Sequence, residues 1–302
     1  MTSRALPGWI DYGLLLLLAA FWGGSFALIK QTVGAYPPAF MSMVRLAIAG
    51  VVMLCIALFL RERIQWSART AWMLLLIGIF GNSLPFSLIA WGQQVVDASL
   101  ASILMGIMPL ATLLLAHFFT GGDEPLSAGK VVGAIIGLAG LAILVGPSVL
   151  YRLGDDGVRQ LAIVGAAISY GINAVLTKSM LHQPRRAAAA ALLLAGALTL
   201  FPVSLLSEDW SAIEPGTAST TAVVLLALFP TAMASLLVFI VLERQGAGFF
   251  SNVNFLVPLF GIVWAVALLG EALDPRALTA LGVILTGLVI ARQSAQKPSR
   301  VA

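Results

Sequence analysis

One arginine lies inside a long apolar stretch of the sequence. Arg45 sits in the segment YPPAFMSMVRLAIAG, with no acidic residue near it. A charged side chain in hydrocarbon costs several kcal/mol unless it is paired, hydrated or able to reach the interface. Arg45 therefore has a functional role or a structural one. In a functional role it contacts a substrate carboxylate, or it bonds helix-end carbonyls at a gate. In a structural role it snorkels to the surface, or it fixes the first two helices by a hydrogen bond.

Prolines inside apolar stretches mark a second group of candidates. Asn82 and Ser83 precede Pro85, and Thr231 follows Pro230. A proline frees a carbonyl one turn earlier, and a polar side chain or a water must satisfy it. The resulting kink either opens and lines a cavity or serves packing alone. The prolines that we expect to act as hinges are Pro85, Pro109, Pro230 and Pro258.

Further polar and aromatic residues are expected to line the same cavity. Asn252 and Asn254 would be costly against lipid, so they should face protein or water. Trp22 and Tyr170, each followed by glycine, can sandwich an amphiphilic substrate and offer an N–H and an O–H as polar handles. Ordinary helix packing is the alternative for each residue. The other candidates for this wall are Asn173, Phe86, Trp91, Met105, Met108 and Phe255.

The sequence lacks the residue patterns of catalytic and metal sites. Its one cysteine, Cys55, excludes a multi-cysteine metal site. Its two histidines, His117 and His182, lie near the ends of apolar stretches, and no nucleophile–base spacing accompanies them. We therefore expect no metal, no cofactor and no enzymatic activity.

Composition identifies the environment of these residues. Only 10% of the 302 residues are charged and 60% are hydrophobic, whereas soluble domains carry about 25% charged residues. Ten charge-poor stretches, most of them near the ~20 residues that span a bilayer, cover residues 12–29, 31–60, 70–96, 98–122, 131–151, 160–177, 187–207, 215–242, 245–270 and 277–291. Runs such as LLLLLAA exclude the alternation of a membrane barrel. The expected fold class is an all-α membrane protein with ten transmembrane helices.

The basic residues predict how these helices are oriented. With a cytoplasmic N-terminus, twelve of the 17 lysines and arginines fall in cytoplasmic segments and four in external loops. We expect both termini in the cytoplasm. Because the basic residues sort by membrane side, the high pI gives no reason to expect nucleic acid. The expected partners are a small-molecule substrate and the lipid bilayer.

The chain repeats itself with an offset near 148 residues. Residues 22–30, WGGSFALIK, match residues 170–178, YGINAVLTK, and residues 94–109 match residues 243–258. The halves, 1–150 and 151–302, hold five stretches each, and an odd number inverts the second copy in the membrane. Lys30 is then external and its counterpart Lys178 cytoplasmic. Inverted repeats around a central cavity are typical of secondary transporters.

Glycines at small-residue spacing predict close helix contacts near the end of each half. Such contacts brace each half or form the seam of a weak dimer, and a monomer remains the alternative. The glycines concerned are Gly133, Gly137, Gly140, Gly282 and Gly287.

Three segments carry a resemblance to a known family. They are WGGSFALIKQTVGAYPPAFMSMVRLAIAG, DASLASILMGIMPLATLLLAHFFTGGDEPLSAGKVVGAIIGLAG and GAGFFSNVNFLVPLFGIVWAVALLGEALDPRALTALGVILTG. They resemble the EamA repeats of the drug/metabolite transporter (DMT) superfamily, and the resemblance covers nearly the whole chain. It implies a ten-helix exporter in a bacterial inner membrane, similar to amino-acid and aromatic-metabolite exporters of the YddG type. The second copy has Tyr170 in place of tryptophan and no arginine matching Arg45.

The function expected from these features is export of small amphiphilic metabolites, aromatic amino acids among them, by alternating access. The alternatives are transport of nucleosides, purines or drug-like cations, and a channel, which would need a continuous polar stripe or a charged ring. No Asp or Glu lies inside a predicted span. We therefore expect transport to run downhill, or to use a proton without a buried carboxylate.

Overall fold

The computed structural model describes residues 7–119, 128–145, 155–177, 180 and 183–296, which form helices and turns without a strand. Six helices are long and apolar enough to cross a membrane: Trp9–Thr32, Pro38–Phe59, Ala68–Gly92, Gly157–Thr177, Arg185–Ser207 and Thr217–Gln245. Shorter apolar helices cover Ala98–Thr112, Val131–Gly140, Val253–Leu269 and Pro275–Ile290. The all-helical membrane fold is confirmed for these residues. The expected boundary at 150–151, both terminal segments, Lys178 and His182 lie outside them.

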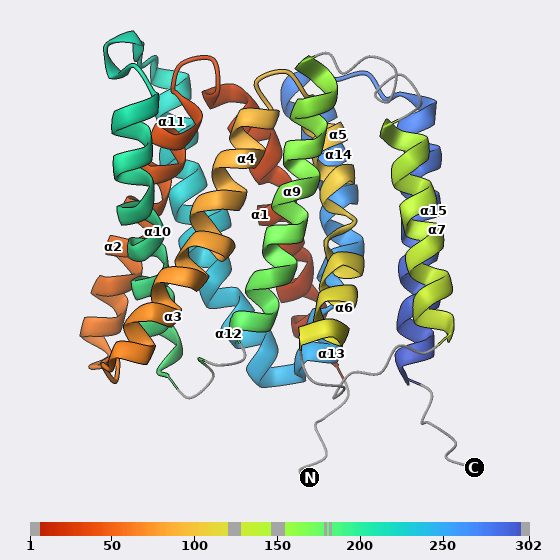
Figure 1. The fold of residues 1–302 in the computed structure, drawn as a ribbon, viewed down its shortest axis with the longest axis horizontal. Coiled ribbons are helices and arrows are strands. Elements are labelled where there is room, and N and C mark those ends of the chain that lie inside the picture. The colour runs from red at the N-terminus through yellow and green to blue at the C-terminus, as the bar shows by residue number, and fades with distance from the viewer. Residues whose placement is uncertain (1–6, 120–127, 146–154, 178–179, 181–182, 297–302) are drawn as a thin grey trace.

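The helices stand roughly side by side in one bundle (Figure 1). The elements of the first half are α1 (Trp9–Thr32), α2 (Pro38–Phe59), α3 (Ala68–Gly78), η1 (Ile79–Ser83), α4 (Leu84–Gly92), α5 (Ala98–Met105), α6 (Met108–Phe119) and α7 (Ala128–Val145). The second half holds α9 (Asp155–Thr177), α10 (Arg185–Ser207), η3 (Trp210–Ala212), α11 (Thr217–Ala227), η4 (Leu228–Met233), α12 (Ala234–Gln245), α13 (Ala247–Phe250), α14 (Val253–Leu269) and α15 (Pro275–Gln296). The η1 and η4 segments are π-helical and join their neighbours into continuous helices.

Local sequence explains where several helices begin and end. Pro38 opens α2, where its missing N–H costs nothing. Ser67 caps α3 by accepting a hydrogen bond from the Thr70 backbone at 3.0 Å. Gly246 ends α12 with a φ of 83° and Gly270 ends α14 with a φ of 66°. These two turns need the left-handed backbone that glycine adopts without strain.

Helices far apart in the sequence pack in pairs. The principal pairs are α7 with α15, α2 with α10 and α1 with α14, while α9 packs against both α4 and α6. Figure 1 shows the first of these pairs at the edge of the bundle. Each pair joins a helix of the first half to one of the second, so the halves are interleaved rather than separate.

Glycines permit the closest of these contacts. A Cβ on Gly287 would lie 2.5 Å from the Gly133 carbonyl oxygen and 2.6 Å from the Gly137 nitrogen, and one on Gly140 would lie 2.8 Å from Ile284. The predicted close contacts are confirmed at these four glycines, which hold α7 against α15. Gly282 has nothing within 4 Å of its would-be Cβ, so it makes no close helix contact within the described chain, and a dimer seam there stays a prediction.

The outside of the bundle is apolar, as lipid contact requires. Leu58, Phe59, Leu198 and Leu206 are among many large hydrophobic side chains that are exposed on the helices. A water-soluble surface would not present so much contiguous apolar area. This surface and the six membrane-length helices identify a multi-pass membrane protein.

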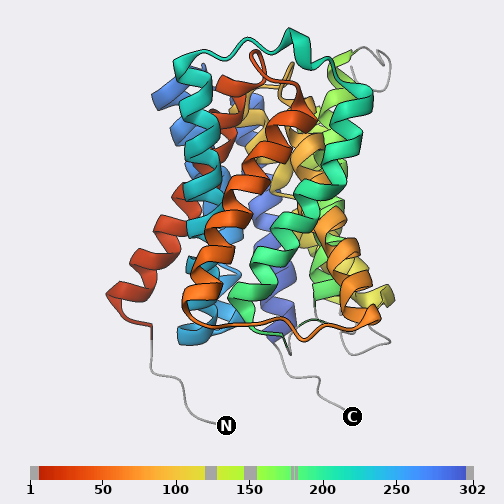
Figure 2. The same cartoon turned by 90° about the vertical axis from the view of Figure 1, so that its left-hand side faces the viewer.

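The bundle has two ends, which we name by a residue of α1. The Asp11 end holds the start of α1 and the end of α15, and the Lys30 end holds the end of α1 and the start of α15 (Figures 1 and 2). The described chain therefore enters and leaves on the same side of the bundle.

Candidate functional site

Arg45 is a buried charge in the interior of a helix rather than at its end. It lies about two turns into α2 and is only 5% exposed. Its Nε donates a hydrogen bond to Thr231 Oγ1 of η4 at 2.8 Å, and its Cζ lies 4.1 Å from the centre of the Phe86 ring of α4. Tyr170 of α9 is close enough to interact with it electrostatically. Two predicted site residues, Arg45 and Phe86, thus come into contact from two helices, α2 and α4.

The structure distinguishes between the alternatives expected for Arg45. Snorkelling is excluded, because the side chain is buried and its Nε is engaged inside the bundle. A structural bond does form, but it joins α2 to η4 rather than to α1. The four ion pairs between described residues do not include Arg45. Its charge is therefore not neutralised by a carboxylate of the described chain.

In each π-helical segment, a hydroxyl donates a hydrogen bond to a backbone carbonyl five residues earlier in the chain. In η1, Ser83 Oγ donates to the Gly78 carbonyl at 3.2 Å, and in η4, Thr231 Oγ1 donates to the Leu226 carbonyl at 2.7 Å. Each bond spans five residues, the spacing of a π-helix. Leu226 lies one turn before Pro230, so Thr231 satisfies the carbonyl that this proline frees, as predicted. Gly78 lies about two turns before Pro85 and is not the carbonyl that Pro85 frees.

The partner of each hydroxyl differs between the segments. Ser83 also lies 3.0 Å from the Gly196 carbonyl and 2.5 Å from Thr199 Oγ1, both on α10. Thr231 instead accepts the hydrogen bond of Arg45. One segment is thus held by neutral groups and the other by a charge.

Two asparagines make contacts at η1, Asn82 from within it and Asn173 from α9. Asn82 Nδ2 donates to the Leu192 carbonyl of α10 at 3.3 Å. A Cβ on Gly81 would lie 2.5 Å from Asn173 Oδ1 of α9, so that amide lies directly against η1. Ser169 of α9, which no sequence pattern singled out, donates to the Phe80 carbonyl at 2.8 Å.

The aromatic pair of the prediction has two different environments. Trp22 packs among hydrophobic side chains of α12 to α14 and meets the Phe250 ring edge-on at 6.2 Å. Tyr170 packs against another cluster, and so do Met108 and Phe255. Met105 is a buried member of that cluster. No ring contact joins Trp22 to Tyr170 within the described part of the chain.

Trp91 lies at the Lys30 end, away from Arg45 along α4. The Arg159 guanidinium stacks 4.0 Å above its ring, and Arg159 also donates to the Trp91 carbonyl at 2.6 Å. Arg159 bonds Gln94 Oε1 as well. The ring therefore serves as a platform for a basic side chain near the helix end.

The second-half asparagines lie where α13 meets α14. Asn252 is the residue before α14, and its Nδ2 donates to the Phe249 carbonyl at 2.9 Å. Asn254 lies in the first turn of α14 and is partly buried. They flank a helix start rather than the middle of the bundle.

Three of the four expected hinge prolines lie at helix irregularities. Pro85 is the second residue of α4, which follows η1 directly. Pro230 lies inside η4, and Pro109 follows the break between α5 and α6. Pro258 differs, because it lies inside the uninterrupted helix α14. Their hinge role remains a prediction.

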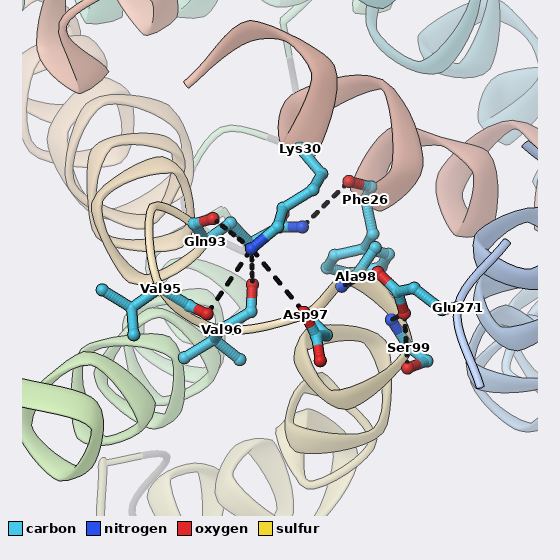
Figure 3. Close-up of polar contacts among 9 residues, drawn as sticks. All are labelled: Phe26, Lys30, Gln93, Val95, Val96, Asp97, Ala98, Ser99 and Glu271. Carbon is cyan, nitrogen blue, oxygen red and sulfur yellow. Dashed lines mark hydrogen bonds and ion pairs between the residues drawn. The ribbon is translucent and has the colours of Figure 1, made fainter. Parts of the chain in front are cut away.

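Lys30 holds the end of α1 to the turn between α4 and α5 (Figure 3). Its Nζ donates to the carbonyls of Gln93 at 3.1 Å and Val96 at 2.9 Å, and it lies 3.8 Å from Asp97 Oδ1. Gln93 Nε2 reaches back to the Phe26 carbonyl at 2.9 Å. These contacts join the end of α1 to α4 and to the turn that follows it.

Glu271 fixes the start of α5 at the same end (Figure 3). It accepts hydrogen bonds from the Ala98 and Ser99 backbone at 2.8 and 3.0 Å and from Ser99 Oγ at 2.6 Å. A carboxylate satisfies unpaired N–H groups and complements the dipole of a helix start. This cap ties α14 to α5.

Two more carboxylates cap the paired helices α2 and α10. Glu208, after α10, accepts from the backbone of Ala39 and Phe40 at the start of α2, at 2.7 and 2.8 Å. No sequence pattern pointed to this cap, because an acidic residue in a loop carries no local signal for a helix start that lies far away along the chain.

Glu62 forms the counterpart at the Asp11 end. It accepts from the backbone of Arg186 and Ala187 at the start of α10, at 3.0 and 3.1 Å, and pairs with the Arg186 guanidinium. Burial raises the pKa of Glu62, but these hydrogen bonds outweigh burial and hold the pKa below its ordinary value.

Asp11 ties the start of α1 to the end of α12. It is buried, and its carboxylate accepts from Arg244 Nε at 2.6 Å and from Gln245 Nε2 at 2.8 Å. Both ends of the bundle are thus cross-linked by polar contacts between the halves.

The arrangement suits binding better than bond making. Within the described residues no group of three or more His, Cys, Asp or Glu side chains lies together as a metal site would require. What the middle of the bundle offers is one cation, hydroxyls, amides and aromatic faces. Such groups can hold and orient a small polar head on an apolar body.

Comparison with known proteins gives a consistent result. The EamA-like transporter family matches residues 9–146 and again residues 159–293. A relative named as a probable terminal-alkyne amino-acid exporter of Streptantibioticus cattleyicolor is 27% identical over 279 residues, which cover 91% of each chain. The uncharacterized inner membrane transporter YedA of Escherichia coli K12 is 25% identical, covering 92% of this chain and 89% of its own.

A solved structure shares the fold. It is described only as "Crystal structure of protein", and it superposes with a TM-score of 0.64 at 21% identity, covering 92% of this chain and 95% of its own. At that identity the likeness concerns the fold alone.

Proposed function

Because the chain belongs to the EamA-like transporter family, we propose that it exports small amphiphilic metabolites, amino acids including aromatic ones, across the bacterial inner membrane. The observation that carries this proposal is the enclosed cation Arg45, set between an aromatic face and a hydroxyl inside a transporter bundle. The amino-acid exporter among its relatives supports the substrate class, and the inner membrane transporter supports the location.

The proposed architecture has ten transmembrane helices in two inverted repeats, 1–150 and 151–302. Two separate matches to one family support two copies of one unit. So do polar bonds that recur at an offset of 148: Ser87 Oγ donates to the Ser83 carbonyl, and Ser235 Oγ donates to the Thr231 carbonyl. An even number of spans agrees with α1 starting and α15 ending at the same end of the bundle. Cytoplasmic termini are part of the proposal.

The proposed mechanism is alternating access around the middle of the bundle. Helices broken by η1, η4 and the α5–α6 break can bend without losing whole turns of hydrogen bonds. Lys30 and Glu271 hold the Lys30 end closed, and their release opens it. Cavity lining is proposed for the candidate residues that surround Arg45, which are Asn82, Ser83, Phe86, Tyr170 and Asn173.

Flux into proteoliposomes tests the proposal. Purified protein is reconstituted and offered amino acids, nucleosides and cationic dyes, with and without the same compound inside. A carrier gives saturable flux that internal substrate accelerates, and we expect this for amino acids. Flux that rises linearly without saturation indicates a channel, and flux of dyes or nucleosides alone contradicts the substrate class.

The energy source is tested in the same vesicles. We propose downhill transport, because Asp11 is already paired with Arg244 and Gln245 and Glu243 pairs with Arg185. An imposed pH gradient should then drive no uphill accumulation. Accumulation that disappears on replacing Asp11 or Glu243 would overturn this point.

A further inference from the structure

Arg45 differs from the basic residues that form ion pairs. Four of those, Lys30, Arg185, Arg186 and Arg244, lie near helix ends and each has a carboxylate within 4.0 Å. Arg45 is 5% exposed and has none within the described chain. A buried charge without a counterion is unfavourable. An unpaired Arg45 is therefore expected to bind an anion that dissociates again.

The bonds that Arg45 does form leave one edge of its guanidinium available. Nε is used by Thr231, and one face is covered by Phe86. No hydrogen bond joins Nη1 or Nη2 to any described residue. The two terminal nitrogens present a planar fork of N–H groups, which matches the two oxygens of a carboxylate.

That free edge is not sealed inside the protein. Among the described residues, the buried side-chain oxygen and nitrogen atoms that lack a hydrogen-bond partner belong to Ser42, Gln93 and Gln160. The nitrogens of Arg45 are absent from that set although two of them lack partners, so they keep accessible surface. This accessible surface is small, because Arg45 as a whole is only 5% exposed.

The residues around the terminal nitrogens of Arg45 determine which groups a ligand can carry beside its carboxylate. Phe86 packs with other apolar side chains of α2 and α10. The Tyr170 hydroxyl has no hydrogen bond to a described residue and lies within electrostatic reach of Arg45. A carboxylate can take two N–H bonds from Arg45, while its apolar body contacts Phe86.

We propose that Arg45 binds the carboxylate of the transported substrate, so that the protein accepts compounds with one carboxylate on an apolar body and rejects their neutral and cationic analogues. This inference rests on the proposed export function and narrows its substrate class. It makes drug-like cations poor substrates, because they bring a positive charge toward Arg45 at low dielectric without a carboxylate to pair with it.

Binding and flux measured on the same ligand series test the inference. The series is L-phenylalanine, L-phenylalaninamide, phenethylamine and 3-phenylpropionate, assayed by thermal stabilisation of the purified protein and by competition in proteoliposomes. We expect both acids to bind at least about tenfold more tightly than the amide and the amine, the loss expected for a charge-assisted hydrogen-bonded contact. Equal binding of acid and amide, or no binding of either acid, overturns the inference.

The two assays separate this inference from the proposed function. Acids that bind selectively without being transported support the carboxylate site and contradict transport. Transport of acid, amide and amine at equal rates supports a carrier and contradicts the carboxylate site. The wild-type comparison decides the question even where a variant fails to fold.

Variants locate the discrimination. Arg45→Met should remove the preference for acids, and Arg45→Lys should keep the preference with weaker binding, because an ammonium retains charge without the planar fork. Arg159→Met is the matched control, since Arg159 also stacks on an aromatic ring, 4.0 Å above Trp91, but at a helix end. It should leave the acid-to-amide ratio unchanged. An unchanged ratio in Arg45→Met would contradict the proposal.

Discussion

The two π-helical segments solve the same backbone problem with different neighbours. In η1, Ser83 Oγ bonds the Gly78 carbonyl and also lies within hydrogen-bond distance of the Gly196 carbonyl and Thr199 Oγ1 of α10. In η4, Thr231 bonds the Leu226 carbonyl and holds Arg45. The two halves thus share a π-helical segment with a hydroxyl-to-carbonyl bond, but they differ in the groups that bond to this hydroxyl. The half that binds a charge is where we place the substrate head group, and the other half serves as a structural control.

Removing the charge of Arg45 should have the largest effect on transport. Arg45→Met is expected to lower transport of carboxylate substrates by about tenfold to a hundredfold, the loss of one or two charge-assisted hydrogen bonds. Initial rates in proteoliposomes measure this effect. A rate within about twofold of wild type, a difference of less than 1 kcal/mol, would show that the charge in the middle of the bundle does not serve transport.

Removing the hydroxyl of Thr231 or of Ser83 should distinguish the two π-helical segments by their effect on the preference for acids. Thr231→Val deletes the bonds to Arg45 and Leu226 at nearly constant volume and should cost about 1–3 kcal/mol of stability. It should also reduce the preference for acids, because the guanidinium is no longer held. Ser83→Ala should cost a similar amount of stability and leave that preference intact. Thermal unfolding in detergent and ligand competition measure the two effects separately, and equal changes in preference would contradict the assignment.

Loosening one end should have a smaller effect. Lys30→Met removes the contacts that tie α1 to the α4–α5 turn. The Lys30 end should then open more often, so that Val96→Cys, introduced with Cys55→Ala, reacts a few-fold faster with a membrane-impermeant thiol reagent. Slower or unchanged reaction would mean that Lys30 does not hold that end closed.

The smallest expected effect is a pH dependence at Glu62. Its pKa in the folded protein lies below the ordinary value of 4.5, so its contribution to stability is complete above that value and is lost as the pH falls through the lowered pKa. Glu62→Gln should remove about 1 kcal/mol and flatten this part of the pH profile of thermal stability. A profile unchanged by the substitution would show that the cap of α10 contributes nothing.

The sequence predicts the helices of this protein better than their partners. Charge-free stretches and proline positions indicated the apolar helices, their irregular segments and the enclosed arginine, because each is a property of neighbouring residues. The bond from Arg45 to Thr231 joins residues 186 positions apart, and the Glu208 and Glu271 caps reach across similar separations. Periodicity tells which face of a helix is apolar but not which helix lies against it.

The same limit explains two differences between the expected and the observed positions. Trp91 is aromatic and lies in an apolar stretch, which favours a place in the cavity wall, yet its ring faces Arg159 at a helix end. Gly282 has the spacing of a contact glycine but faces open space. In both cases the outcome depends on tertiary neighbours that local sequence does not encode.

A structure determined with the best-transported carboxylate bound is the most direct test of whether Arg45 binds the substrate carboxylate. We expect the carboxylate to accept hydrogen bonds from Nη1 and Nη2 of Arg45, with Nε still bonded to Thr231 and the apolar body against Phe86. A substrate bound elsewhere in the bundle, with the terminal nitrogens of Arg45 left as they are now, would contradict the account.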